Sequence, residues 1–216
     1  MSIKSNLLEI KATLPDNVML VAVSKTKPVP DLTEAYEAGQ RIFGENKIQE
    51  MSEKFEQMPK DIEWHMIGHV QSNKVKFMAS FVSLVHGVDS LKLLEEIDKQ
   101  ALKNNRIIDC LLQIHIAEED TKFGLDEAEL NDLLQSETFR KLKNVKIKGL
   151  MGMATFTENP AQIKKEFLHL KSIFDKISVE NSDFEILSMG MSGDYQLAID
   201  CGSTMVRIGS SIFGTR

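Results

Sequence analysis

The sequence contains few of the features that mark secreted, membrane-spanning or disulfide-rich proteins. Only two of its 216 residues are cysteines. Because neither Cys110 nor Cys201 belongs to a CxxC pair, we expect both to be small, buried, hydrophobic residues. No apolar run approaches the roughly 20 residues of a membrane helix. The N-terminus lacks the hydrophobic stretch of a signal peptide, so we expect a cytoplasmic protein that does not associate with a membrane.

Basic charge is also scarce, and the common nucleotide-binding motifs are missing. The net charge is −6 with a pI near 5.5, and no basic stripe is present, so we expect no nucleic-acid partner. No GxGxxG follows a strand candidate and no GxxxxGK[ST] occurs, which excludes the usual dinucleotide and P-loop sites. His65 and His69 have the spacing of metal ligands on a helix, but they flank Gly68 at a strand end, so we expect no metal site.

Instead, the chain shows a regular alternation of short apolar runs and helical stretches. The strand candidates are Met19–Ser24, Arg41–Phe43, Glu63–Ile67, Phe81–His86, Ile107–Ile116, Val145–Met151, Phe184–Ser188 and Met205–Ile208. The helix candidates between them are Pro30–Ala38, Lys47–Gln57, Gln71–Ala79, Ser90–Lys103, Asp126–Leu134, Pro160–Ile177 and Tyr195–Ile199. Strands that alternate with helices predict a parallel sheet built from βαβ units.

Eight such strands predict an α/β fold in the form of a single (β/α)8 TIM-type barrel domain spanning residues 1–216. An extra amphipathic helix is expected at Ile3–Leu14, before the first strand. A doubly wound open sheet is the structural alternative, but the strand count and the missing dinucleotide motif favour the barrel. The chain is short for this fold, so its connections should be short too.

The segment Leu20–Pro28, LVAVSKTKP, is the first to indicate chemistry. An apolar run leads into Lys25, and a proline ends the segment. Lys25 should therefore stand at the carboxyl end of a buried strand, where α/β barrels keep their active sites. A partly desolvated lysine loses its proton more easily and can form a Schiff base. Taken alone, the segment also fits a surface lysine just past a strand end.

The second informative segment is Ser188–Gly214, in which two strand candidates each end in glycine and serine. Ser192 follows the seventh strand and suits the N-cap of the next helix. Gly209 and Ser210 follow the eighth strand, and glycine lets the backbone approach a ligand closely. Loops after strands seven and eight, together with a helix N-terminus, form the recurrent phosphate site of these barrels. We therefore expect phosphate binding here rather than two ordinary turns.

Arg207 should stand at the tip of the eighth strand, beside the first strand of a closed barrel and so near Lys25. A neighbouring cation lowers the pKa of an amine further. An ion pair with a nearby carboxylate is the alternative role for this arginine. A lysine nucleophile, an arginine and a phosphate cradle on one rim indicate a phosphorylated aldehyde as ligand, and pyridoxal 5′-phosphate (PLP) has that chemistry.

Six segments, in the same order, then point to a known family. They are VAVSKTKP (Val21–Pro28), FGENKIQE (Phe43–Glu50), WHMIGHVQSNK (Trp64–Lys74), KGLMGMA (Lys148–Ala154), LSMGMSGDYQLAI (Leu187–Ile199) and STMVRIGSSIFG (Ser203–Gly214). Through them the chain resembles the PLP homeostasis proteins of the YggS/PROSC type over nearly its whole length. That family is similar to the N-terminal barrel of alanine racemase. One position departs from its pattern, because His115 stands where asparagine is usual, and this leaves the role of His115 open.

The resemblance implies a set of cofactor-binding residues and no dedicated catalytic residue. Lys25 would hold PLP covalently as a Schiff base, and Arg207 would face the pyridine nitrogen. The phosphate would be bound by Ser192 and by the backbone of Gly209 and Ser210. The other pocket residues in matching motifs would be Asn46, His65, Met153 and Ser188.

The chemistry of PLP helps to separate a carrier from an enzyme. PLP enzymes that stabilise carbanions commonly keep a carboxylate at the ring nitrogen, whereas an arginine cannot accept a proton there. Racemases of this fold also carry a second β domain and a tyrosine base. This chain ends at Arg216 and has only Tyr36 and Tyr195, both expected on outer helices. We therefore expect a PLP homeostasis protein that buffers or delivers PLP, without robust catalytic activity.

Two enzymatic alternatives differ from this carrier function. The first is a weak PLP-dependent amino-acid racemase, and the second is a Schiff-base aldolase acting on sugar phosphates, which a bound PLP chromophore would exclude. The expected partners are PLP itself and PLP-dependent apo-enzymes as its recipients. Without the second domain that racemase dimers use, we expect a monomer.

Overall fold

The computed structural model describes residues 2–119, 123–179 and 181–215. The strands are β1 (Met19–Val23), β2 (Ile42–Glu45), β3 (Glu63–Met66), β4 (Leu84–Val88), β5 (Ile108–Ile114), β6 (Val145–Gly152), β7 (Ile186–Met191) and β8 (Met205–Ile208). The helices are α1 (Ile3–Thr13), α2 (Val29–Glu37), α3 (Ile48–Gln57), α4 (Leu91–Lys103), α5 (Glu127–Gln135), α6 (Glu137–Lys141), α7 (Pro160–Ser178), α8 (Tyr195–Asp200) and α9 (Ser210–Phe213), with a 3-10 helix η1 (Ser72–Phe77).

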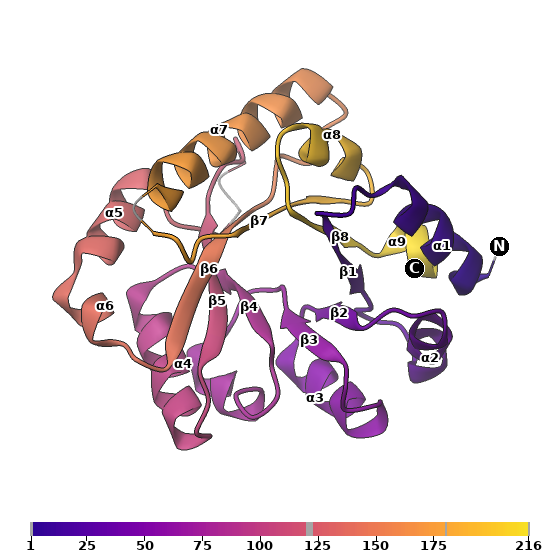
Figure 1. The fold of residues 1–216 in the computed structure, drawn as a ribbon, viewed down its shortest axis with the longest axis horizontal. Coiled ribbons are helices and arrows are strands. Elements are labelled where there is room, and N and C mark those ends of the chain that lie inside the picture. The colour runs from indigo at the N-terminus through magenta and orange to yellow at the C-terminus, as the bar shows by residue number, and fades with distance from the viewer. Residues whose placement is uncertain (1, 120–122, 180, 216) are drawn as a thin grey trace.

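The strands form one closed barrel of parallel strands, surrounded by the helices (Figure 1). Each strand pairs with the next in the chain, and β8 closes the barrel by pairing with β1, where Val21 lies opposite Arg207. This confirms the predicted TIM-type (β/α)8 barrel with an extra N-terminal helix. Because all strands run the same way, their carboxyl ends meet at one rim, which carries the active sites of such barrels.

The strand bounds differ from the prediction chiefly at the carboxyl ends. β2 continues to Glu45 and β7 continues to Met191, although the prediction ended them at Phe43 and Ser188. The extra residues include Gly44, Glu45 and Gly190, residue types that are uncommon in strands. They pair with neighbouring strands all the same, as Glu45 does with Met66 and Met191 with Arg207. Pairing in the closed barrel therefore overrides local preference at the rim.

The helices follow the prediction with two kinds of exception. The predicted helix Gln71–Ala79 is only the 3-10 helix η1, and the short helices α6 and α9 were not predicted. The N-terminal helix α1 contacts α2 and α9, and both termini lie at this side of the barrel (Figure 1). The side-chain amide of Asn6 donates to the carbonyl oxygen of Ile212 at 3.0 Å. α1 thus covers the barrel where α9 is too short to do so alone.

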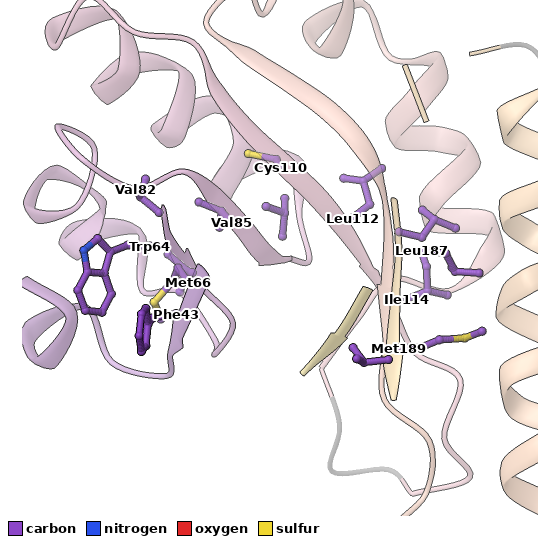
Figure 2. Packing of buried hydrophobic residues seen from close by; sticks show 14 of the residues in the cluster. Phe43, Trp64, Met66, Val82, Val85, Cys110, Leu112, Ile114, Leu187 and Met189 are labelled. Carbon is purple, nitrogen blue, oxygen red and sulfur yellow. The ribbon is translucent and has the colours of Figure 1, made fainter. Parts of the chain in front are cut away.

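The hydrophobic core has two parts, one outside the barrel wall and one inside. Outward-facing strand residues pack against the helices, and Figure 2 shows several of them, including Phe43 and Trp64, whose ring centroids are 5.9 Å apart. A smaller, separate cluster of inward-facing residues fills the barrel interior on the side away from the carboxyl-terminal rim. It consists of Val21, Leu84, Leu111, Met151 and Met205.

The barrel interior becomes polar toward the carboxyl ends of the strands. Strand side chains alternate between the two faces, so the next inward-facing residue on β4 after Leu84 is His86. On β8, the next after Met205 is Arg207. Both His86 and Arg207 are buried. An apolar layer therefore lies beneath a buried polar layer, and the polar layer faces the rim where ligands bind.

Three further observations bear on the class of protein. Cys110 and Cys201 are both free and buried, as predicted. Within residues 2–119, 123–179 and 181–215, no helix is long and apolar enough to cross a membrane. The same residues include no group of three or more His, Cys, Asp or Glu side chains that could hold a metal ion.

Candidate functional site

A cavity of about 720 Å³ opens at the carboxyl-terminal rim of the barrel. Its volume lies within the range of about 300–1,000 Å³ that is typical of small-molecule sites. Most of the predicted site residues line it, namely Lys25, Asn46, Met153, Ser192, Arg207, Gly209 and Ser210. These residues come from the ends of five different strands, so the closed barrel brings together groups that are far apart in the sequence.

Lys25 lies in a tight turn directly after β1. The turn is closed by the backbone N–H of Lys27, which donates to the carbonyl oxygen of Ser24 at 3.0 Å. Thr26 has a positive φ of 64°, a strained conformation for a residue other than glycine. Its backbone N–H donates to Oε1 of Glu50 at 2.5 Å, which ties the turn to α3. The half-buried Lys25 is therefore carried on an anchored turn.

The buried side chain of Lys54 supports this turn through hydrogen bonds and ion pairs. Nζ of Lys54 donates to the carbonyl oxygen of Ser24 at 2.7 Å and to Oε1 of Glu45, also at 2.7 Å. It also contacts Oε1 of Glu50 at 2.8 Å, while the Ser24 hydroxyl donates to Glu45 at 2.6 Å. Burial raises the pKa of the Glu45 carboxyl, although the hydrogen bond and charge of Lys54 oppose the rise. We call Ser24, Glu45, Glu50 and Lys54 the Lys54 cluster.

The Lys54 cluster was not predicted from the sequence, although one signal for it is present there. Lys54 lies on the same face of α3 as the buried Ile48 and Met51, because positions three apart share a helix face. A lysine in an apolar stripe needs a buried partner. Here the partners are the two carboxylates of Glu45 and Glu50.

The loops after β7 and β8 meet at the cavity through Ser192 and Gly209. The backbone N–H of Gly209 donates to the hydroxyl oxygen of Ser192 at 3.2 Å, which leaves the hydroxyl hydrogen able to donate to a ligand. A Cβ atom on Gly209 would lie 3.0 Å from the carbonyl oxygen of Val23, so the close packing of this loop on β1 favours glycine. Ser210 begins α9, where the first backbone N–H groups have no partner within the helix.

The prediction that Ser192 caps the following helix is wrong. α8 begins after Asp194, and the side chain of that residue does not cap the helix. Instead, Oδ1 of Asp194 accepts from the backbone N–H of Met191 at 2.5 Å and shapes the loop. Ser192 is the second residue of the turn from Met191 to Asp194, and its hydroxyl contacts Gly209 of the β8 loop rather than α8.

Arg207 is buried at the wall of the cavity and is held by two neutral acceptors. Its Nη1 donates to the hydroxyl oxygen of Ser188 at 2.6 Å, and its Nη2 donates to the carbonyl oxygen of Gly152 at 3.1 Å. Burial lowers the pKa of its guanidinium to about 10, against the opposing charge of Asp194. Arg207 therefore stays charged at neutral pH, and neither of these two hydrogen bonds neutralises it.

His65 and Ser188 lie deeper in the barrel and are not among the residues that line the cavity. They are connected through His86, which the sequence prediction did not include in the site. Nδ1 of His86 lies 3.1 Å from Oγ of Ser188, and Nε2 of His86 lies 3.1 Å from Nδ1 of His65. We call Arg207, Ser188, His86 and His65 the histidine chain. It links β8, β7, β4 and β3 inside the barrel.

Burial governs the protonation of both histidines in this chain. It lowers the pKa of His65 to about 3. Burial also lowers the pKa of His86 well below its usual value, assisted by the charges of His65 and Arg207. Both imidazoles are therefore neutral at physiological pH, so each has one donor and one acceptor nitrogen.

The outer wall of the cavity is formed by the loops after β5 and β6, which a buried carboxylate joins. Glu166 of α7 accepts from the backbone N–H of Thr155 at 2.6 Å and from its hydroxyl at 2.7 Å. It also accepts from the backbone N–H of Glu118 at 3.3 Å. Burial opposes the charge on Glu166, but these hydrogen bonds together lower its carboxyl pKa. Thr155 and Phe156 line the cavity beside this contact.

Two further histidines lie near the rim. The ring of His69 stacks on Phe123 with centroids 4.3 Å apart, and its Nδ1 pairs with Asp89 at 3.3 Å. Both His69 and Phe123 line the cavity. Nε2 of His115 lies 2.9 Å from the carbonyl oxygen of Ala117. The imidazole of His115 therefore contacts its own loop, and His115 does not line the cavity.

Comparisons with known proteins agree with one another. The family described as the alanine racemase N-terminal domain matches residues 1–216. A pyridoxal phosphate homeostasis protein of Synechocystis is 42% identical over 212 residues, which are 96% of this chain and 96% of that protein. One from Aquifex aeolicus is 40% identical over 199 residues, covering 91% of this chain and 86% of that protein. The structure of PipY of Synechococcus elongatus with PLP bound matches with a TM-score of 0.88 at 34% identity, covering 99% of this chain and 100% of that one.

Proposed function

This chain belongs to the pyridoxal phosphate homeostasis protein family, and from that premise we propose that it binds PLP covalently through Lys25 and buffers or delivers it. The observation that carries this proposal is the convergence, in one cavity, of Lys25, Arg207 and the donor groups of the loops after β7 and β8. The PLP bound to the related PipY supports the same ligand here.

The residues around the cavity fit PLP in size and in chemistry. The amine of Lys25 would hold the aldehyde as a Schiff base. The Ser192 hydroxyl, with the backbone of Gly209 and Ser210, offers hydrogen-bond donors to a phosphate, and Arg207 would face the pyridine nitrogen. Asn46 and Met153 would line the remaining walls. When bound, PLP supplies an electron sink for carbanions.

The protein groups favour storage of PLP over its use in catalysis. An arginine at the ring nitrogen cannot accept or supply a proton there at neutral pH. The hydroxyl of Tyr36 donates to Asp61 at 2.9 Å, and the hydroxyl of Tyr195 lies 3.1 Å from Oγ1 of Thr13. Neither tyrosine lines the cavity. A two-base proton transfer that uses a tyrosine of this chain is therefore disfavoured.

A weak PLP-dependent amino-acid racemase is the second candidate function. The observation in its favour is the match of the whole chain to the alanine racemase N-terminal domain. Under either function PLP is the small-molecule partner. Delivery to PLP-dependent apo-enzymes, a monomeric state and a cytoplasmic location stay predictions from the sequence.

The covalent attachment is tested by borohydride reduction of the PLP-loaded protein, followed by peptide mapping. We expect a visible absorption band before reduction and a pyridoxyl group on Lys25 after it. Lys25→Ala should abolish the band while the fold survives. Lys103→Ala, which changes an exposed lysine of α4, should leave the band unchanged. A label on another lysine, or a band that persists in Lys25→Ala, would contradict the assignment.

A transfer experiment separates a carrier from an enzyme. The loaded protein is mixed with an apo-form of a PLP enzyme, and the recovery of that enzyme's activity is followed over time. We expect recovery from the wild-type protein but not from protein whose PLP has been fixed by reduction. Formation of D-alanine from L-alanine by the loaded protein alone, without such transfer, would favour the racemase.

A further inference from the structure

The histidine chain runs from Arg207 at the cavity wall into the barrel interior and ends at His65, which does not line the cavity. Arg207 donates to Ser188, Ser188 contacts His86, and His86 contacts His65. All four side chains are at most 4% exposed. A buried polar side chain must be satisfied by its neighbours, because water cannot reach it. The hydrogen-bond roles in the chain are therefore coupled.

The direction of these hydrogen bonds follows from Arg207. A guanidinium only donates, so it uses one acceptor position of the Ser188 hydroxyl oxygen. The Ser188 hydrogen then needs an acceptor, and among the described residues Nδ1 of His86 is the one that the contacts provide. If Nδ1 carried the hydrogen instead, the fully buried Ser188 hydroxyl would have no acceptor for its own proton.

The hydrogen bond between His86 and His65 has a fixed direction as well. With an unprotonated Nδ1, the neutral His86 carries its hydrogen on Nε2 and donates it to Nδ1 of His65. Donation therefore runs in one direction, from Arg207 through Ser188 and His86 to His65. Each member fixes the hydrogen position of the next, as in other buried networks.

This arrangement holds Arg207 without cancelling its charge. A carboxylate partner would position a guanidinium but would also neutralise it. The hydroxyl of Ser188 and the carbonyl of Gly152 use two of its five N–H groups and carry no charge. Because Arg207 lines the cavity, a ligand bound there would meet its positive charge.

We infer that His86 is a positioning residue for Arg207: by accepting from Ser188, it orients the serine oxygen toward the guanidinium and holds that cation at the cavity wall through a neutral acceptor. The ligand class that this wall suits is a heteroaromatic ring with an unprotonated nitrogen, or another uncharged or anionic acceptor. Its connection to PLP rests on the proposed function. The direction of donation along the histidine chain does not rest on the proposed function, since it is a property of the cofactor-free barrel.

The first test measures the tautomers in cofactor-free protein. Histidine labelled with ¹⁵N reports by NMR which ring nitrogen carries the hydrogen. We expect both His86 and His65 to be neutral with the hydrogen on Nε2. A hydrogen on Nδ1 of His86, or a charged imidazole at neutral pH, would overturn the inference whether or not the protein binds PLP.

The second test compares His86→Asn with His86→Leu in PLP titrations followed by visible absorption. The Asn amide oxygen can replace Nδ1 as an acceptor for Ser188, whereas leucine cannot. We expect His86→Leu to weaken PLP binding about tenfold and to shift the absorption band, and His86→Asn to stay within about threefold of wild type. Equal affinity and spectra for His86→Leu and wild type would refute the positioning role.

A third variant keeps the inference testable if His86→Leu does not fold. Ser188→Ala removes the link between His86 and Arg207 with little change in volume, and it should reproduce the spectral shift. Where both variants fold, His86→Leu should add little to Ser188→Ala, because residues of one network are not additive. Fully additive effects of the two substitutions on PLP affinity would contradict the coupling of these residues in the histidine chain. Failure of the wild-type protein to bind PLP would refute the proposed function and leave the tautomer test standing.

Discussion

Mild acid should destabilise this protein, because His65 and His86 are buried in neutral form. Burial lowers the pKa of His65 from 6.5 to about 3. Burial, with the charges of His65 and Arg207, lowers the pKa of His86 in the same direction. In the unfolded chain both histidines take up protons below about pH 6.5. Between this pH and about 3, the unfolded state therefore binds more protons than the folded state.

The sign and size of the effect follow from this difference. When the unfolded state binds more protons, the free energy of unfolding falls as the pH falls. The stabilisation is thus fully present above the unfolded pKa and is lost as the pH falls toward the folded pKa. For one histidine, protonation of the unfolded state at about pH 5 amounts to about 2 kcal/mol. The pair should lose about 4 kcal/mol, a large part of a typical stability of about 5–15 kcal/mol.

Urea titrations at about pH 7.5 and about pH 5 measure this loss directly. The change in unfolding free energy between the two pH values should be about 4 kcal/mol for wild type and about 2 kcal/mol for His65→Gln or His86→Gln. His169→Gln is the control, because the side chain of His169 is 47% exposed, and it should behave as wild type does. The raised pKa of Glu45 acts in the opposite sense, which is why differences between variants are compared.

Equal losses of stability in wild type and in both inner histidine variants would refute this prediction. A loss of less than about 1 kcal/mol for wild type over this range would refute it as well. Either result would mean that the imidazoles are protonated in the folded protein, or that the barrel opens to water around them. The histidine chain would then lack the neutral acceptors on which its direction depends.

Three further predictions concern the packing around the site, each measured by urea unfolding near neutral pH. Lys54→Met removes the buried cation from two carboxylates and should lower the free energy of unfolding by about 3–5 kcal/mol. The control Lys99→Met changes a side chain that is 60% exposed and should change this free energy by less than about 0.5 kcal/mol. Equal effects of the two substitutions would contradict a buried ion pair at Lys54. Gly149→Ala would place its Cβ 1.8 Å from a carbonyl oxygen of β7 and should cost roughly 3 kcal/mol or more, while Gly193→Ala, with open space around it, should be nearly neutral. Glu166→Gln weakens the hydrogen bonds that join two cavity loops and should cost about 1–3 kcal/mol; an unchanged stability would show that these loops are held in another way.

The fold was largely predictable because its signals are local. A buried strand needs a short apolar run, and each crossover helix needs an amphipathic stretch, so the alternation is legible without tertiary contacts. The placement of Lys25 and Arg207 on one rim followed from the same alternation, because parallel strands carry their carboxyl ends to one side. Of the nine cofactor-binding residues that the six family segments implied, seven line the cavity.

Depth within the barrel was not predictable in the same way. His65 and Ser188 were expected to line the pocket, yet they lie beneath it, joined by His86. How far a residue lies from the rim depends on strand stagger in the closed barrel, which sequence spacing along one strand does not report. The helix cap predicted for Ser192 was wrong for a related reason, since its hydroxyl contacts Gly209 on the next strand's loop rather than its own helix.

The sequence by itself therefore determined the order of strands and helices, the rim on which the chemistry lies, and the lysine that we propose holds PLP. These features depend on local periodicity and on the rule that parallel strands share one carboxyl edge. Only the tertiary structure decided which polar groups meet, as in the Lys54 cluster and the histidine chain. Such contacts join residues from separate strands and helices. Their energies arise from desolvation and hydrogen-bond geometry, which exist only once the barrel has closed.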